Sequence, residues 1–349
     1  MKKRILAMIL AVLTCLALFA GCSEDGNTEQ NNTDENNEKE LTPVTVAEFR
    51  GVTWVPMYLA YQLGYFEDEG LDLELVKIND GPVCFKSMQT GDADFCILSQ
   101  EVSLKAEEQG QHSSVIATML DTRYYAFVAT SEIESVEDLK GKTVFASTPG
   151  SAPYTFCVAI MEEYGLEIGK DVTLVTMDKG AVVAALEKGE IQAAFINADN
   201  YQEADNVEGI HYLVDTRNEE DASKYLNSDF FPAEVILCTK EYGENNPEIV
   251  QAFVNATCKG LDWLQEHTSE EAAAEVSELF SGMEEQALAD KIEIMRGAFS
   301  KNGYVSEEGQ NAVVDFCKRS GIITTDLTYE DTVDMSYVEN AIKAGYAAE

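Results

Sequence analysis

Positive charge is scarce in this sequence. Lysine and arginine together number 24, against 63 aspartate and glutamate residues, so the formal net charge is −39. A surface this acidic repels the phosphates of nucleic acids and the headgroups of anionic lipids. The composition therefore excludes nucleic acid as a partner, whereas the charge of a local binding pocket can still differ from this balance.

Motifs of metal and covalent chemistry are also missing. The only three histidines (His112, His211 and His267) lie far apart, and neither G-x-S-x-G nor H-E-x-x-H occurs. Gly141-Lys142-Thr143 resembles the end of a P-loop, but Val136 stands where its first glycine is required. The six cysteines after residue 22 form no C-x-x-C pair, which favours buried thiols and leaves disulfides open. We predict no enzyme, no metal site and no cofactor.

Long apolar runs are absent after the first twenty residues. Three basic residues precede an apolar run over 5–20, which ends at Gly21-Cys22 and predicts a signal peptide over 1–21. This end resembles a bacterial lipobox, although Phe19 stands where leucine is usual. The resemblance implies that a diacylated Cys22 anchors the protein outside the cell membrane, since two acyl chains give stable attachment. The alternative is an ordinary signal peptide with an incidental cysteine.

The next segment has almost no bulky apolar residues. Residues 22–42 are rich in asparagine, glutamate and aspartate, and Leu41 is their only bulky aliphatic side chain. Such a segment buries too little surface to offset the entropy cost of ordering it. We predict a flexible tether, with folded structure beginning near Pro43.

The chain after residue 42 contains a weak internal repeat. Helical spacing over 58–66, a glycine turn and an alternating strand over 71–76 recur at 156–166 and 172–175. In both copies a short helix bracketed by glycines and an apolar strand come next. Strands that alternate with helices predict mainly parallel sheets with right-handed crossovers, here in two α/β lobes.

Two further strands predict how the lobes are connected. A strand over 124–130 leaves the first lobe, and one over 233–239 returns to it. The expected organisation is therefore lobe 1 over 43–131 and lobe 2 over 132–234. Residues 235–349 return to lobe 1 and add helices, which we place mostly on that lobe.

Several segments resemble one family of substrate-binding proteins. Residues 54–60, 64–71 and 91–95 resemble the first lobe of nitrate/sulfonate/taurine and thiamine-pyrimidine binding proteins, and 138–151 and 189–194 resemble the second lobe. The resemblance covers residues 43–265. It implies a type II periplasmic-binding-protein fold (Venus flytrap) with a helical C-terminal tail. It also implies a cleft that closes on its ligand, and docking on an ABC permease with its ATPase.

The resemblance implies an extracytoplasmic solute-binding lipoprotein without catalysis. Its ligand would be a small organic molecule, sulfonate/taurine-like or pyrimidine-like. One alternative is a surface sensor or adhesin on the same fold. Another is an enzyme like the fungal pyrimidine synthases, which consume an internal histidine, bind pyridoxal phosphate and carry a cysteine-rich motif that this chain lacks.

Ligands of open parallel sheets bind beyond the carboxyl ends of the strands. This rule nominates loop residues in both predicted lobes, and the ligand-binding candidates are Arg50, Thr53, Trp54, Asp80, Ser99, Glu101, Gly150, Ser151, Tyr154, Asp178, Asn197 and Asp199.

Physical roles follow for some candidates. Residues 147–153 open a helix, whose free N–H groups favour a carboxylate or sulfonate, and Ser151 either binds the ligand or caps that helix. Trp54 and Tyr154 either stack on a planar ligand or pack in the core. Arg50 pairs with an anion or stays at the surface. The acids accept hydrogen bonds from an amine or remain solvated: Asp80, Glu101 and Asp199.

Overall fold

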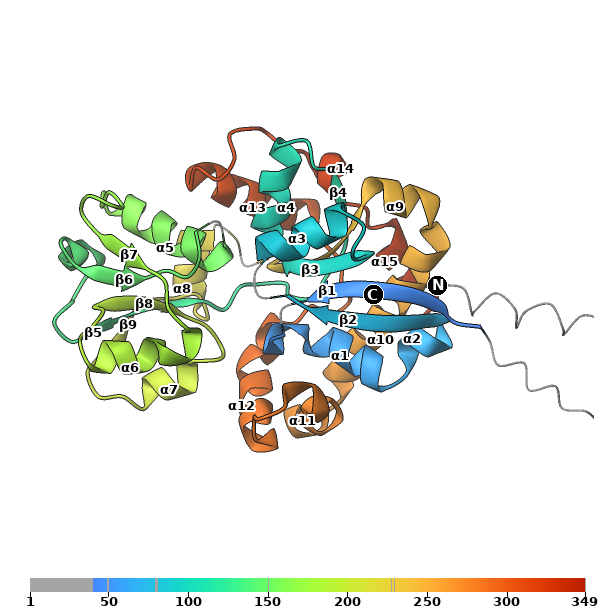
Figure 1. Ribbon diagram of the computed structural model, residues 1–349, viewed down its shortest axis with the longest axis horizontal. Coiled ribbons are helices and arrows are strands. Elements are labelled where there is room, and N and C mark those ends of the chain that lie inside the picture. The colour runs from blue at the N-terminus through green and yellow to red at the C-terminus, as the bar shows by residue number, and fades with distance from the viewer. Residues whose placement is uncertain are drawn as a thin grey trace, which may run out of the picture. The chain divides into compact units, whose positions relative to one another are not determined.

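Two five-stranded sheets form the frame of the part of the chain that the structure describes (Figure 1). This structure is a computed structural model, and it describes residues 40–48, 50–78, 81–149, 151–226, 228 and 230–348. The predicted signal peptide, Cys22 and most of the tether lie outside these residues. Among the described residues the first strand begins at Thr42, next to the predicted start of folded structure near Pro43.

Sheet one has four strands that run in one direction and one that opposes them. β1 pairs in parallel with β2 and β3, and β10 lies antiparallel between β3 and β4. In spatial order the strands are β2 (Leu71–Lys77), β1 (Thr42–Glu48), β3 (Phe95–Ser99), β10 (Glu234–Thr239) and β4 (Ser113–Thr118).

Sheet two repeats this arrangement. β6 pairs in parallel with β7 and β8, and β5 lies antiparallel between β8 and β9. In spatial order the strands are β7 (Thr173–Val175), β6 (Thr143–Phe145), β8 (Ala193–Ile196), β5 (Ala126–Thr130) and β9 (Ile210–Asp215). The two orders are equivalent, so the structure confirms the internal repeat and the two α/β lobes read from the sequence.

The strands β5 and β10 are exchanged between the lobes. β10 returns to sheet one as predicted, because it pairs with β3 and β4. β5 bonds to β8 and β9, so it belongs to sheet two. The boundary expected at residue 131 is therefore wrong: the chain has already entered sheet two at Ala126.

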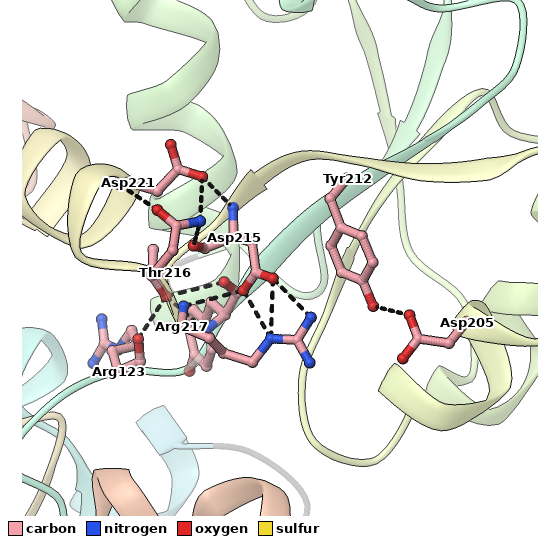
Figure 2. A network of polar contacts seen from close by, with 9 residues as sticks. Arg123, Asp205, Tyr212, Asp215, Thr216, Arg217 and Asp221 are labelled. Atoms are coloured by element: carbon pink, nitrogen blue, oxygen red, sulfur yellow. Dashed lines mark hydrogen bonds and ion pairs between the residues drawn. The ribbon is translucent and has the colours of Figure 1, made fainter.

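The two crossings between the sheets lie side by side. The Met119 N–H donates a hydrogen bond to the Glu234 carbonyl at 2.7 Å, and the Phe231 N–H donates one to the Asp121 carbonyl at 2.7 Å. Figure 2 shows how the first crossing is tied to the end of sheet two, where the Thr216 hydroxyl donates to the Arg123 carbonyl at 2.5 Å. Arg217 holds the neighbouring Asp215 through paired hydrogen bonds.

Helices cover both sheets. The first-lobe helices are α1 (Val55–Gln62), α2 (Tyr65–Asp68), α3 (Gly81–Gln89) and α4 (Gln100–Glu108). The second-lobe helices are α5 (Ala152–Glu163), α6 (Val182–Glu187), α7 (Tyr201–Asp205) and α8 (Glu219–Asp221). The C-terminal helices are α9 (Lys240–Asn245), α10 (Pro247–Glu266), α11 (Ser269–Val276), α12 (Glu285–Met295), α13 (Glu307–Arg319), α14 (Tyr329–Thr332) and α15 (Ser336–Lys343).

The longest helix of the described residues, α10, joins the C-terminal region to sheet one. Its apolar residues recur every three to four positions, and Phe253 stacks on Phe95 of β3 with ring centroids 4.2 Å apart. At Gly260 the helix comes so close to α1 that an added Cβ would overlap the Pro56 carbonyl oxygen. These contacts place the predicted helical tail against the first lobe.

Two predictions about the rest of the chain can be compared with the described residues. No helix among them is both long and apolar enough to cross a bilayer. All six cysteines after residue 22 are buried, as their apolar surroundings predicted, and their thiols are free, which the sequence had left open.

Candidate functional site

A cavity of about 620 Å³ lies where loops from both sheets meet the two crossings. It is lined by residues that follow the carboxyl ends of β1, β2 and β3 in sheet one, and of β6, β7 and β8 in sheet two. This is the position that open parallel sheets use to bind ligands, and the size suits a small organic molecule.

The first-lobe wall carries Arg50, Thr53 and Lys77. The Arg50 guanidinium already bonds to Glu48 at 3.0 and 2.6 Å and to the Leu279 carbonyl at 2.9 Å. Its charge is therefore balanced within the lobe. Lys77, at the end of β2, forms no ion pair with any described residue.

The second-lobe wall is built around the turn before α5. Ser147 has a φ of 67°, a left-handed conformation that is costly for a non-glycine residue and is typical of binding loops. Ser151 lines the cavity, and its hydroxyl oxygen also accepts the Tyr154 N–H at 3.4 Å. Both roles predicted for Ser151 are therefore sterically compatible, since its O–H remains available as a donor.

The floor is formed by charged residues of the crossings. Arg123 is 1% exposed and binds both carboxylate oxygens of Glu101, which is 2% exposed. Glu234, at the start of β10, accepts the Ser99 hydroxyl at 3.0 Å through Oε1. Burial raises the pKa of Glu234 to about 7, although Arg123 and Ser99 oppose this shift.

The charge of the lining differs from that of the whole chain. Four basic side chains face three acidic ones: Arg50, Lys77, Arg123 and Lys179 against Asp178, Asp199 and Glu234. Both arginines are paired with carboxylates, but Lys77 and Lys179 have no ion-pair partner among the described residues. The lining acids Asp178, Asp199 and Glu234 have no ion-pair partner among the described residues either, so the lining offers unpaired groups of both signs. Each lobe contributes one lysine as a partner for an anionic group on the ligand.

A contact from α12 joins the two walls. The Lys291 ammonium donates to the main-chain carbonyls of Ala198 at 3.3 Å and Asp199 at 2.5 Å. Gln202 of α7 bonds to Asp290 of α12 at 3.3 Å. The C-terminal region therefore holds the loop after β8 at one edge of the cavity.

Many of the predicted binding residues meet at this cavity: Arg50, Thr53, Ser99, Ser151, Asp178, Asn197 and Asp199. Asp80 and Gly150 lie outside the described residues.

The structure places three other candidates away from the lining. Trp54 is fully buried and stacks on Tyr58, because it leads into a helix that is itself in the core. Glu101 lies behind the floor, where it neutralises Arg123. Tyr154 is half-buried and packs against the core, and it does not line the cavity.

The sequence interpretation missed the floor. Arg123, Tyr125 and Glu234 lie where the chain crosses between lobes, and a strand-end rule does not select them. A charged residue beside each apolar crossing strand was the available signal, because a charge next to a buried strand needs a partner or a function. Among the described residues no cluster of three metal-binding side chains occurs.

Residues 52–271 match the family described as NMT1/THI5 like. The chain belongs to the NMT1/THI5-like family. A Bacillus subtilis (strain 168) relative, named as a candidate aliphatic sulfonates-binding protein, is 21% identical over 98% of both chains. The solved periplasmic aliphatic sulphonate binding protein SsuA of Escherichia coli has a TM-score of 0.60 at 18% identity, covering 81% of this chain and 86% of that one. The predicted two-lobe periplasmic-binding-protein fold is thereby confirmed.

The relatives of this chain also include proteins named as enzymes. The 4-amino-5-hydroxymethyl-2-methylpyrimidine phosphate synthase THI12 of Saccharomyces cerevisiae (strain ATCC 204508 / S288c) is 24% identical over 60% of this chain and 63% of its own. The relatives of this chain therefore include both proteins named as binding proteins and proteins named as synthases.

Proposed function

We propose that this protein is the solute-binding lipoprotein of an ABC importer and captures a small organic anion between its lobes. The observation that carries the proposal is the cavity itself, with Lys77 from one lobe and Lys179 from the other and no ion pair for either within the described residues. An anion held by both lysines would stabilise the arrangement in which the lobes face each other. The importer role rests on the sulfonate-binding relatives.

A thermal-shift panel on the full chain tests ligand capture. It would contain alkyl and aryl sulfonates, taurine, nitrate, aminopyrimidines, riboflavin and amino acids. A ligand at about a hundred times its Kd adds about 2.7 kcal/mol to the free energy of unfolding. This is a rise in Tm of roughly several degrees. A flat panel would contradict the proposal for these ligand classes.

The synthase names of some relatives make an enzyme the second candidate. The fungal pyrimidine synthases that the sequence resembles use one of their own histidines as a reactant. None of the three described histidines lines the cavity: His112 bonds to Glu107, His267 stacks on Trp263 and His211 lies in β9. This placement favours binding over catalysis. Pyrimidine product formed on incubation with pyridoxal phosphate would favour the enzyme instead.

Attachment through Cys22 is the localisation part of the proposal. In a bacterial host, Cys22→Ser should move the protein from the membrane fraction to the soluble extracytoplasmic fraction, because the acyl chains supply the anchoring energy. Fractionation and labelling with a fatty acid measure this. Cys15→Ser, in the apolar run, is the matched control and should stay on the membrane. Membrane retention of Cys22→Ser would show that another feature attaches the protein.

A further inference from the structure

The cavity floor contains a buried carboxylate oxygen that no described residue satisfies. Glu234 is 5% exposed and lines the cavity. Its Oε1 accepts the Ser99 hydroxyl at 3.0 Å, whereas Oε2 has no hydrogen-bond partner among the described residues. A buried acceptor without a donor costs about 1–3 kcal/mol, more when it is charged. When Glu234 is ionised, this atom therefore needs a donor from elsewhere.

The neighbouring cation does not supply that donor. Arg123 directs its two terminal nitrogens to Glu101 and, through Nη2, to the Ala233 carbonyl at 3.2 Å. With Arg123 neutralised by Glu101, an ionised Glu234 leaves the floor with one excess negative charge. The two lysines of the lining, Lys77 and Lys179, belong to the walls rather than the crossings, and Lys179 acts on Glu234 through its charge without a hydrogen bond to Oε2.

The chemistry of Oε2 limits what can bind there. A carboxylate oxygen only accepts hydrogen bonds, and so do the oxygens of nitrate, sulfonates and carboxylates. A simple anion cannot satisfy an ionised Glu234, and it would be repelled by it. An amino or ammonium group offers both the donor and, when charged, the opposite sign.

We infer that Glu234 is the subsite for an N–H group of the ligand. The ligand then carries an amino group, which binds at the floor, and an anionic or polar group, which binds at the lysines of the walls. The inference rests on the proposed solute-binding function and narrows its ligand class. Ser99 is a positioning residue, because its hydroxyl holds Oε1 and leaves Oε2 without a partner among the described residues.

The test uses compounds that differ only in the amino group. The first pair is 3-aminopropane-1-sulfonate and propane-1-sulfonate. The second is 4-amino-5-hydroxymethyl-2-methylpyrimidine and the same compound without its 4-amino group. Calorimetric Kd values are measured on the full wild-type chain and on Glu234→Gln. Glutamine can still accept the Ser99 hydroxyl, but it replaces the free acceptor with an N–H₂ donor.

The expected result is a preference for the amino compound of at least one pair by about tenfold or more in the wild type. In Glu234→Gln this preference should fall below about twofold. Glu107→Gln is the matched control, because the Glu107 side chain is 7% exposed but lies outside the cavity, and this variant should bind as the wild type does. Unfolding curves of both variants establish that they are folded.

Two results would overturn the inference. If the amino-free compounds bind as tightly as the amino compounds, or if the preference survives in folded Glu234→Gln, then Glu234 does not recognise an amino group. In either case the proposed solute-binding function stands. If none of the four compounds nor any member of the thermal-shift panel binds, the proposed function fails and the inference fails with it.

Discussion

Glu234 and Arg123 are buried charged residues of the same floor, and their surroundings act on them differently. Arg123 has a carboxylate partner, and the contact with Glu101 raises its pKa even though burial opposes this. Glu234 has only a hydroxyl on Oε1, so burial dominates and its pKa rises to about 7. Arg123 is thus held as a cation, while Glu234 titrates near neutral pH.

This difference predicts a pH-dependent stability. The pKa of Glu234 lies above its ordinary value of 4.5. The contribution of Glu234 to the free energy of unfolding is therefore fully present below pH 4.5 and is lost as the pH rises through about 7. The groups that act on it are Arg123, Glu101, Lys179 and Ser99. Without ligand, the Tm of the wild type should therefore fall between about pH 5 and about pH 8 by roughly 5 °C more than the Tm of Glu234→Gln does.

Differential scanning calorimetry across that pH range measures the effect. Glu74→Gln, on the exposed face of β2, serves as the control and should follow the wild-type curve. Parallel curves for Glu234→Gln and the wild type would mean that the carboxyl of Glu234 ionises as freely in the folded protein as in the unfolded chain.

Contacts between helices determine how the C-terminal region joins the first lobe. Gly260→Ala should destabilise the protein by about 1–3 kcal/mol, because the new Cβ overlaps the Pro56 carbonyl oxygen and α1 and α10 must separate. Gly243→Ala in α9 is the control, since its nearest neighbour would be the Cys238 sulfur at an ordinary 3.5 Å. Denaturant unfolding compares the two, and equal stability would show that the helices adjust without cost.

A second helix contact acts on ligand binding. Lys291→Met removes the hydrogen bonds from α12 to the Ala198 and Asp199 carbonyls at the edge of the cavity. Because this contact joins the walls, its loss should weaken the best ligand of the panel by about threefold to tenfold. Lys170→Met, which removes a surface pair with Glu167, should have no effect. Unchanged affinity in Lys291→Met would confine α12 to a structural role.

At the scale of the whole molecule the dominant property is negative charge. A net charge of −39 destabilises a compact state through self-repulsion, and salt screens that repulsion. The Tm of the full chain should therefore rise by roughly several degrees when NaCl is raised to about 0.5 M, and KCl should act equally. A Tm that is constant or falls with salt would mean that local ion pairs, rather than net charge, control the electrostatic stability.

The sequence by itself determined the two lobes, the helical C-terminal region and seven of the residues that line the cavity. These follow from local patterns: strand and helix periodicity repeats along the chain, and the residues just after β1, β3, β7 and β8 are adjacent to their strands. The tertiary structure alone decided which sheet β5 joins, because its partners β8 and β9 lie more than sixty residues away. It alone decided that Trp54 packs in the core, and that Arg123 and Glu234 meet at the floor. Those contacts join segments far apart in the chain, and pairing across such distances depends on the packing of both lobes rather than on any local pattern.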